Sequence, residues 1–259
     1  MISVVTITFN NTSELIETLA TLKSAGGIES VVVNGGSCNK AKELLYKNKI
    51  KSISEKDYGI SDAFNKGLFL SSCESITFLN SGDFLIDSTY YERADEILVK
   101  NPEIDFIYAD IIFVHKSSGE HIVKPGDIRI GDMPFPHPSL IVRRRVFEEI
   151  GTFDKNYKLA MDYEFVYRMI KHGCKGYYLL GAPVVKMIGD GVSSSNGKEG
   201  LRERAKALKS NDLWSFKRKR KNLELYIKHI VRELLDSFHL LEQYDKLKKI
   251  KKLKKKGDK

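Results

Sequence analysis

The sequence has few cysteines and no long apolar run, and these two absences set the first limits. Cys38, Cys73 and Cys174 stand far apart in no paired spacing, so neither a disulfide framework nor a zinc site is indicated, and we expect a reducing compartment. No stretch approaches the roughly 20 apolar residues of a membrane-spanning helix. Residues 1–9 also lack the basic start of a signal peptide. We therefore expect a protein that is neither exported nor membrane-spanning.

Two nucleotide-binding signatures are also absent. Residues 2–9 read as a buried strand, but residues 8–13 carry no Gly-x-Gly-x-x-Gly motif and no Gly-rich basic loop. The first absence argues against a dinucleotide-binding enzyme, and the second argues against a nucleotidyltransferase.

The positive charge is concentrated in one part of the chain. The formal net charge is +9, and residues 216–259 hold 16 of the 43 Lys and Arg residues but only 6 of the 34 Asp and Glu residues. The first 215 residues are close to neutral. We expect two regions, a domain over residues 1–200 and a basic helical region over residues 201–259.

Strand and helix patterns alternate along the first region. Such alternation predicts an α/β fold with a mainly parallel sheet, in which ligands bind at the carboxyl ends of strands. The loops at 10–13, 34–39 and 80–83 would meet there. The expected strands are 2–9, 29–33, 50–54, 75–79, 106–114 and 139–142, and the expected helices are 15–22, 40–48, 62–70, 90–100 and 162–173.

Asp83 and Asp162 are carboxylates at positions suited to metal binding and to general-base catalysis. Asp83 ends the tetrad Asn80-Ser81-Gly82-Asp83 after a buried strand, and a divalent cation that bridges two phosphates needs only one or two protein carboxylates. Asp162 begins a helix, whose dipole would keep it ionised and able to act as a general base. The alternatives are a plain turn with a capping Asp83 and a helix cap at Asp162.

Three other segments have both functional and structural interpretations. Residues 54–67 place many polar groups around a helix start. Such a segment would bind the phosphates and ribose of a nucleotide, or it would simply be a capped helix on the surface. His137, in a Pro-rich loop, would contact substrate or serve the structure. Residues 189–195 read as an active-site lid or a linker.

These segments together resemble the GT-A-fold glycosyltransferases of family 2, especially bacterial members that build surface polysaccharides. The resemblance covers about residues 1–195, and seven motifs occur in the family's order. They are Thr8-Phe9-Asn10, the 34–37 loop, 54–57 with 59–67, 80–83, His137, 143–154 and Met161-Asp162-Tyr163.

The resemblance implies a role for each matching position. Asp83 looks like the family's metal ligand, holding Mn²⁺ or Mg²⁺ against the diphosphate of a nucleotide sugar. Asp162 looks like the base that deprotonates the acceptor hydroxyl, so that one displacement inverts the anomeric carbon. The implied substrate-binding residues are Thr8, Phe9, Asn10, Asn34, Gly35, Asp57, Asp62, Asn65, Lys66, Asn80, Ser81 and His137.

Three departures from the family pattern bear on these roles. Asn34 stands where relatives usually have a base-recognising Asp; its amide oxygen still accepts from uracil, so a UDP-sugar is favoured. Asn80 and Gly82 replace carboxylates of the metal motif, which leaves Asp83 alone there. Pro138 stands where relatives often have Gln.

Apolar residues recur at helical spacing through 223–241, between two runs of lysine and arginine. A basic amphipathic helix binds anionic membranes, whereas the alternatives are packing on the domain or homodimerisation. No recognisable nucleic-acid-binding module accompanies it. We expect a cytoplasmic enzyme, peripheral on the inner membrane face, that glycosylates a saccharide or lipid-linked saccharide for a polysaccharide, O-antigen or capsule. The competing interpretation is a non-catalytic nucleotide-sugar-binding or membrane-binding protein.

Overall fold

The computed structural model describes residues 1–36, 38–115, 119–189 and 197–238. Within these residues the main sheet has seven strands in the order β10-β6-β9-β4-β1-β2-β3, and every neighbouring pair is parallel except the two that contain β9. The expected mainly parallel α/β sheet is confirmed. The strands are β1 (Ile2–Thr8), β2 (Ile28–Asn34), β3 (Lys51–Ser54), β4 (Ser75–Phe78), β6 (Phe106–Tyr108), β9 (Ile141–Arg143) and β10 (Gly176–Tyr178).

Helices cover both faces of this sheet because its strands are apolar on both sides. Along β1, Ile2 and Val4 pack with α1, α2 and α4, whereas Val5 packs with α3, α5 and α6. The predicted helices are confirmed to within three residues at each end. The helices are α1 (Thr12–Leu22), α2 (Asn39–Lys47), α3 (Ile60–Leu70), α4 (Tyr90–Lys100), α5 (Arg144–Ile150) and α6 (Met161–Lys171).

A second, four-stranded sheet corrects one sequence prediction. Its order is β5-β11-β7-β8, formed by β5 (Phe84–Leu85), β11 (Val185–Ile188), β7 (Ile111–His115) and β8 (Gly119–Val123). The single strand expected over 106–114 is therefore two strands in different sheets. The chain changes sheet at Asp110, whose carboxylate accepts from the Tyr178 hydroxyl at 2.5 Å and whose carbonyl accepts from the Val184 N–H at 3.0 Å.

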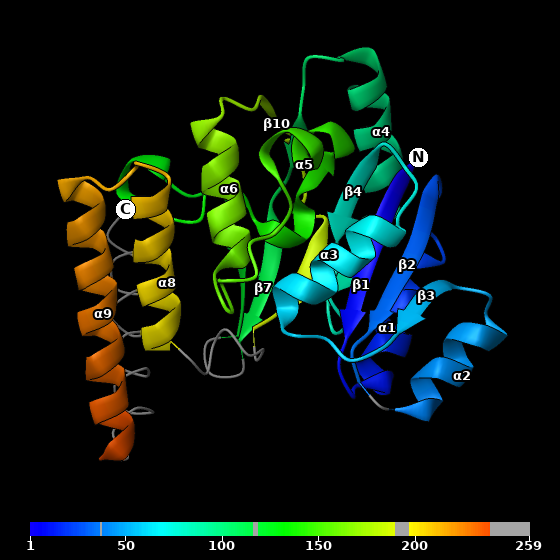
Figure 1. Cartoon of the computed structure of the whole chain (residues 1–259), viewed down its shortest axis with the longest axis horizontal. Coiled ribbons are helices and arrows are strands. Elements are labelled where there is room, and N and C mark those ends of the chain that lie inside the picture. The colour runs from blue at the N-terminus through cyan, green and yellow to red at the C-terminus, as the bar shows by residue number, and fades with distance from the viewer. Residues whose placement is uncertain (37, 116–118, 190–196, 239–259) are drawn as a thin grey trace, which may run out of the picture.

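The C-terminal helices α8 (Gly197–Ser210) and α9 (Phe216–Ser237) lie side by side next to α6, at the opposite end of the molecule from α2 (Figure 1). Ala207 and Leu208 of α8 belong to the same core as α6. The predicted division after residue 200 falls inside α8, and this helix packs as part of the first region. Among the described residues, no helix combines the length and apolarity needed to cross a membrane.

Candidate active site

The carboxyl ends of the parallel strands bring the predicted loops to one edge of the main sheet. β1 pairs with β2 so that Thr8 lies beside Asn34, and the Gly35 N–H donates to the Thr8 carbonyl at 3.0 Å. On the other side of β1, the Ser81 N–H donates to the Ile7 carbonyl at 3.1 Å. The loops after β1, β2 and β4 are therefore neighbours, as predicted, over their described residues.

Asn34, expected to recognise the base, is 0% exposed. Its Oδ1 accepts from the Gly36 N–H at 3.2 Å, and its Nδ2 donates to the Ser54 hydroxyl at 3.3 Å. A Cβ on Gly35 would lie 1.8 Å from the Asp57 carboxylate, so Asp57 lies directly over this loop. Asn34 therefore shapes the loop from inside, and Asp57 is the polar group on its outer side.

The loop after β1 presents two of the predicted residues to solvent. The Phe9 side chain is 70% exposed, and Asn10 is exposed in the left-handed region at φ 54°. Thr8 is buried, and its hydroxyl donates to the Asn11 carbonyl at 3.2 Å. Phe9 and Asn10 thus face solvent, whereas Thr8 holds the loop.

Lys66 is surrounded by carboxylates. Its Nζ lies 3.0 Å from Glu55, 2.8 Å from Asp57 and 3.2 Å from Asp62. Burial alone would lower the pKa of Lys66, but the hydrogen bonds to Asp57, Glu55 and Asp62 outweigh it and raise that pKa. The Lys66 ammonium therefore organises the segment between β3 and α3.

Asp62 and Asn65, both predicted to bind substrate, join α3 to the loop before α6. The Lys155 ammonium lies 2.6 Å from the Asp62 carboxylate. The Asn65 amide donates to the Phe153 carbonyl at 2.8 Å and accepts from the Phe153 N–H at 3.0 Å. Both side chains are buried, so their polar atoms serve this junction.

The contacts of Asp62 make the free energy of unfolding depend on pH. The Lys155 hydrogen bond lowers the Asp62 pKa to about 2, helped by the Tyr58 N–H and Lys66 and opposed by burial. Because the folded pKa lies below the ordinary value near 3.9, this stabilisation is complete above about pH 4 and is lost as the pH falls toward 2. We expect Asp62→Asn to lower the free energy of unfolding by about 2 kcal/mol at pH 7 and by about half as much at pH 3.

Urea unfolding of both proteins at the two pH values measures this difference. The control is Asp212→Asn, which removes a largely exposed ion pair with Lys171 and should cost less than about 1 kcal/mol. An Asp62→Asn penalty that is equal at pH 3 and pH 7 would contradict the assignment.

Asp83 is 4% exposed, and its Oδ1 accepts from the Ile188 N–H at the end of β11 at 3.2 Å. Burial raises the Asp83 pKa to about 7, and the Glu14 carboxylate adds to this. Glu14 is close, because a Cβ on Gly82 would lie 3.0 Å from its carboxylate oxygen. The buried Asn80 Oδ1 has no hydrogen-bond partner among the described residues.

These oxygens suit a hard cation. The part of the chain that the structure describes contains no group of three or more His, Cys, Asp or Glu side chains placed to hold a metal. A Mg²⁺ or Mn²⁺ ion bound mainly by phosphates and water needs only one or two carboxylates. Asp83, the orphaned Asn80 oxygen and the nearby Glu14 meet that requirement. Ser81 is partly buried, and its hydroxyl lies 3.5 Å from the Asn11 carbonyl.

Asp162 lies in the first turn of α6, partly exposed, and its Oδ1 accepts from the Tyr163 N–H at 2.7 Å. His137 stacks on Phe64 and Phe78, with ring centroids 5.4 and 6.1 Å apart. Burial lowers the pKa of His137, while the Asp162 charge opposes the shift. A neutral imidazole therefore lies within electrostatic reach of the Asp162 carboxylate.

Asp162 opens into a groove of about 480 Å³ between α6 and the C-terminal helices. Met187 of β11 also lines this groove, and the next residue, Ile188, bonds to Asp83. The end of β11 thus connects the surroundings of the two predicted carboxylates. The remaining lining residues come mainly from the loop before α6, α8 and α9, and are Met133, Leu159, Ala160, Tyr163, Gly197, Gly200, Leu201, Arg204, Leu225, Lys228 and His229.

Sequence reasoning missed Glu203, which holds the loop that carries Asp162. This buried α8 carboxylate accepts from the backbone N–H groups of Lys158, Leu159 and Ala160 at 2.9, 2.8 and 2.8 Å. A lone Glu in a Lys-rich helix gives no signal of such a role. Of the predicted loop 189–195, residues 190–195 lie outside the described residues.

We expect Glu203→Ala to lower the free energy of unfolding by about 3 kcal/mol, because three N–H groups lose a charged acceptor. It should also lower kcat more than it changes the donor KM, because Asp162 follows two residues after Ala160. Glu203→Gln, whose amide oxygen still accepts, should recover part of both losses. The control is Glu199→Ala on the same helix, where the carboxylate is exposed and pairs with Arg202 at 3.3 Å.

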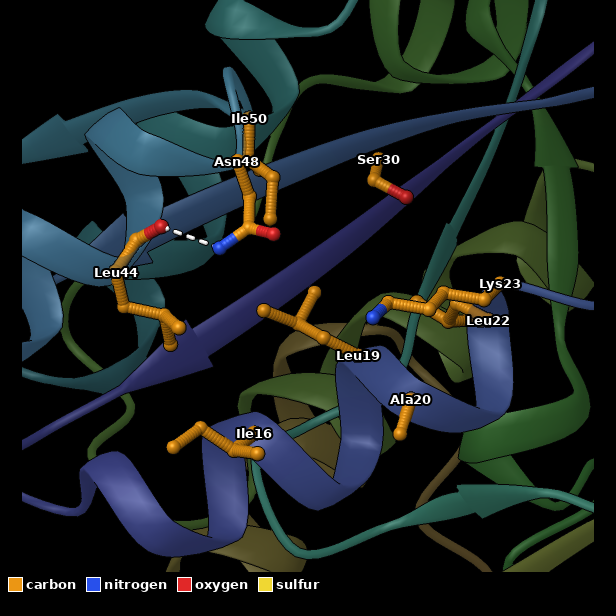
Figure 2. Close-up of a pocket in the computed structure, with 9 residues that line it drawn as sticks. All are labelled: Ile16, Leu19, Ala20, Leu22, Lys23, Ser30, Leu44, Asn48 and Ile50. Atoms are coloured by element: carbon orange, nitrogen blue, oxygen red, sulfur yellow. Dashed lines mark hydrogen bonds between the residues drawn. The ribbon is translucent and has the colours of Figure 1, made fainter.

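Another pocket, of about 270 Å³, lies away from this edge between α1 and α2 (Figure 2). Its lining is mostly apolar, and the Asn48 amide donates to the Leu44 carbonyl at 2.8 Å. Lys23 is the only titratable side chain in its described lining. This pocket offers no arrangement of groups for acid–base or metal chemistry.

Solved structures establish the class of fold. Staphylococcus aureus TarS 1–349 in complex with UDP-GlcNAc matches with a TM-score of 0.67 and 17% identity, over 92% of this chain and 75% of that chain. The mannosyltransferase PcManGT from Pyrobaculum calidifontis, in complex with GDP-Man and Mn²⁺, matches with a TM-score of 0.55 and 13% identity, over 97% and 86%. The fold is that of GT-A glycosyltransferases.

The sequence establishes the family. A model described as "Glycosyl transferase family 2" matches residues 3–151, so the chain belongs to glycosyl transferase family 2. A "PGL/p-HBAD biosynthesis glycosyltransferase" of Mycobacterium bovis is 23% identical over 173 residues, covering 64% of this chain and 68% of the relative. An uncharacterized glycosyltransferase of Mycobacterium tuberculosis is 25% identical over 177 residues, with the same coverage.

Proposed function

We propose that this glycosyltransferase moves a sugar from a nucleoside diphosphate to an acceptor hydroxyl with inversion, using Asp162 as the base and a cation at Asp83. The observation that carries the proposal is the position of β11. Its Met187 lines the Asp162 groove, and its Ile188 N–H bonds to Asp83. These two contacts support a site in which the proton acceptor and the cation approach the same strand end.

Asp162 accepts the proton of the acceptor hydroxyl as the new bond forms. The hydroxyl oxygen attacks the anomeric carbon, and the bond from that carbon to the diphosphate oxygen breaks on the opposite face. The carboxylate stands in the first turn of α6, and one of its oxygens already accepts from the Tyr163 N–H. The other oxygen has no hydrogen-bond partner among the described residues and would take the hydroxyl proton.

A Mn²⁺ or Mg²⁺ ion would be held by Asp83, with Asn80 and Glu14 as the further oxygen donors in reach. When bound, it would act as a Lewis acid for the departing diphosphate. The protein contributes a buried carboxylate whose position is fixed by the Ile188 N–H.

The nucleotide would lie on the edge formed by the loops after β1, β2 and β3. Phe9 offers an exposed ring for stacking, and the Asp57 carboxylate and the Asn10 side chain lie against Gly35 and Gly36 of the next loop. Asn34 would not contact the nucleotide and would instead hold the loop after β2 in place. UDP remains the favoured nucleotide, in line with the UDP-GlcNAc bound by S. aureus TarS, although PcManGT binds GDP-Man.

The Asp162 groove is the candidate acceptor site. Its walls include the apolar side chains of Met133, Leu159, Leu201 and Leu225. Such walls suit a saccharide that carries an apolar or lipid portion. We therefore place the reaction in surface-polysaccharide synthesis on lipid-linked acceptors.

A thermal-shift panel of nucleotide sugars tests the donor assignment. With Mn²⁺ present, we expect one UDP-sugar to raise Tm and GDP-, ADP- and dTDP-sugars to have smaller effects, because ligands that bind only the native state stabilise it. A GDP-sugar that stabilises more than every UDP-sugar would overturn the choice of base. If no nucleotide sugar raises Tm, the result contradicts the proposed transferase function itself, because the protein then binds no donor.

A further inference from the structure

Helix α9 has two different faces. On its inner face, Leu225, Lys228 and His229 line the Asp162 groove, and the Arg218 guanidinium donates twice to the Ile128 carbonyl at 3.1 and 3.0 Å. At about 100° per residue, the opposite face carries a set of apolar side chains. This outer stripe consists of Phe216, Leu223, Ile227, Val231 and Leu234, together with Phe238 directly after the helix end.

The outer stripe is exposed along its whole length. Its six side chains are between 39% and 80% exposed. Arg220 separates Phe216 from the rest of the stripe. From Leu223 to Phe238 large apolar groups follow one another on one face, which is uncommon on a monomer surface and marks a contact site. In Figure 1 this helix forms one end of the molecule, with α8 on its inner side.

Cations flank the stripe. Lys217, Lys219 and Arg220 form no ion pair with the residues that the structure describes, whereas Lys221 lies 3.5 Å from Asp132 and Lys228 pairs with Glu224. A basic hollow of about 570 Å³ adjoins the stripe. Its lining is Asp127, Arg129, Ile130, Phe216, Lys217, Arg220, Lys221 and Glu224.

We propose that the outer face of α9 docks on an anionic lipid bilayer, with the stripe in the acyl–headgroup boundary and the flanking cations against lipid phosphates. An anionic bilayer removes the apolar side chains from water and binds the cations at the same time. A second copy of the chain packed in parallel fits less well. Two parallel α9 helices would bring the Lys217 to Lys221 runs of both copies against each other.

This orientation also limits what the acceptor can be. That inference about the acceptor rests on the proposed transferase function, whereas the inference about the docking surface does not. The groove with Asp162 lies on the inner side of α9, so the helix diameter of about 10 Å separates it from the bilayer. The acceptor is then an amphiphile whose lipid stays in the membrane and whose sugar end reaches around α9 to the groove.

Flotation of the full chain with vesicles tests the docking surface. Wild type should bind phosphatidylcholine vesicles that contain phosphatidylglycerol, bind pure phosphatidylcholine far less, and be released by salt. The double variant Leu223→Glu/Ile227→Glu should bind at least tenfold more weakly. Lys217→Gln/Arg220→Gln should lose roughly 25-fold, since each cation near the surface contributes about fivefold. The matched control is Val99→Glu, which changes an apolar side chain on α4 that is even more exposed, and it should bind like wild type.

Several outcomes would overturn the proposal. Failure of wild type to bind anionic vesicles rejects it directly. If light scattering shows a dimer that Leu223→Glu/Ile227→Glu dissociates, with no vesicle binding by wild type, the stripe belongs to a second copy. If deletion of 239–259 abolishes binding while the stripe and cation variants do not, the contact lies outside α9. Unchanged circular dichroism and donor thermal shift in each variant exclude misfolding and keep this result separate from the transferase proposal.

Discussion

Asp162→Asn is expected to lower kcat by about 10³-fold while leaving the donor affinity within a few-fold of wild type. The asparagine oxygen can still accept from the Tyr163 N–H, so the start of α6 keeps its geometry. What disappears is the ability to take a proton from the acceptor, and general-base removal has effects of this size. Initial rates of sugar transfer and donor binding by thermal shift measure the two quantities separately.

The matched control for Asp162 is Glu92→Gln, which neutralises an exposed carboxylate in the first turn of α4. It should transfer sugar at the wild-type rate, because the α4 terminus does not line the groove. A fall in kcat of less than tenfold in Asp162→Asn would mean that another group accepts the proton.

Asp83→Asn is the second change with a large expected effect. Loss of a Lewis acid removes several kcal/mol of transition-state stabilisation, so kcat should fall by 10²-fold or more. The fold should survive, because the amide oxygen can accept from the Ile188 N–H and a neutral side chain avoids burying a charge. In EDTA, Tm of the variant should therefore equal or exceed that of wild type.

Metal binding gives an independent measure of the same change. Mn²⁺ with UDP should raise Tm of wild type by several degrees and that of Asp83→Asn much less, since the cation stabilises only a protein that binds it. An equal rise in both proteins would place the cation on other residues. Glu14→Gln distinguishes a direct ligand from a neighbouring charge, because only a ligand should weaken the metal response.

Much of the site architecture follows from strand ends, and these were predictable. The apolar runs before Asn10, Asn34 and Asn80 are short, β-branched and separated by helical patterns, so they had to form parallel strands with their ends together. The roles of individual polar residues did not follow in the same way. The side-chain amides of Asn34 and Asn65 could bond equally well to a loop of the protein or to a nucleotide. Only their burial in the structure shows that they bond to the protein.

Other features depended on contacts between distant segments. The run 106–114 has no Gly or Pro, so nothing local indicated that the chain changes sheet at Asp110. Glu203 looks like a solvated charge in a Lys-rich helix until α8 packs against α6 and brings it to three backbone N–H groups. The boundary predicted at residue 200 falls inside α8, which contributes Ala207 and Leu208 to the main core.

The most direct test of the account is release of nucleoside diphosphate from the donor that the thermal-shift panel selects, with Mn²⁺ or EDTA, for wild type, Asp162→Asn and Asp83→Asn. We predict steady release by wild type with Mn²⁺ that rises when an amphiphilic acceptor is added. EDTA and Asp83→Asn should suppress it, and Asp162→Asn should abolish the acceptor-dependent part. Release by wild type that EDTA and both substitutions leave unchanged would contradict the assignment of these two carboxylates to the reaction.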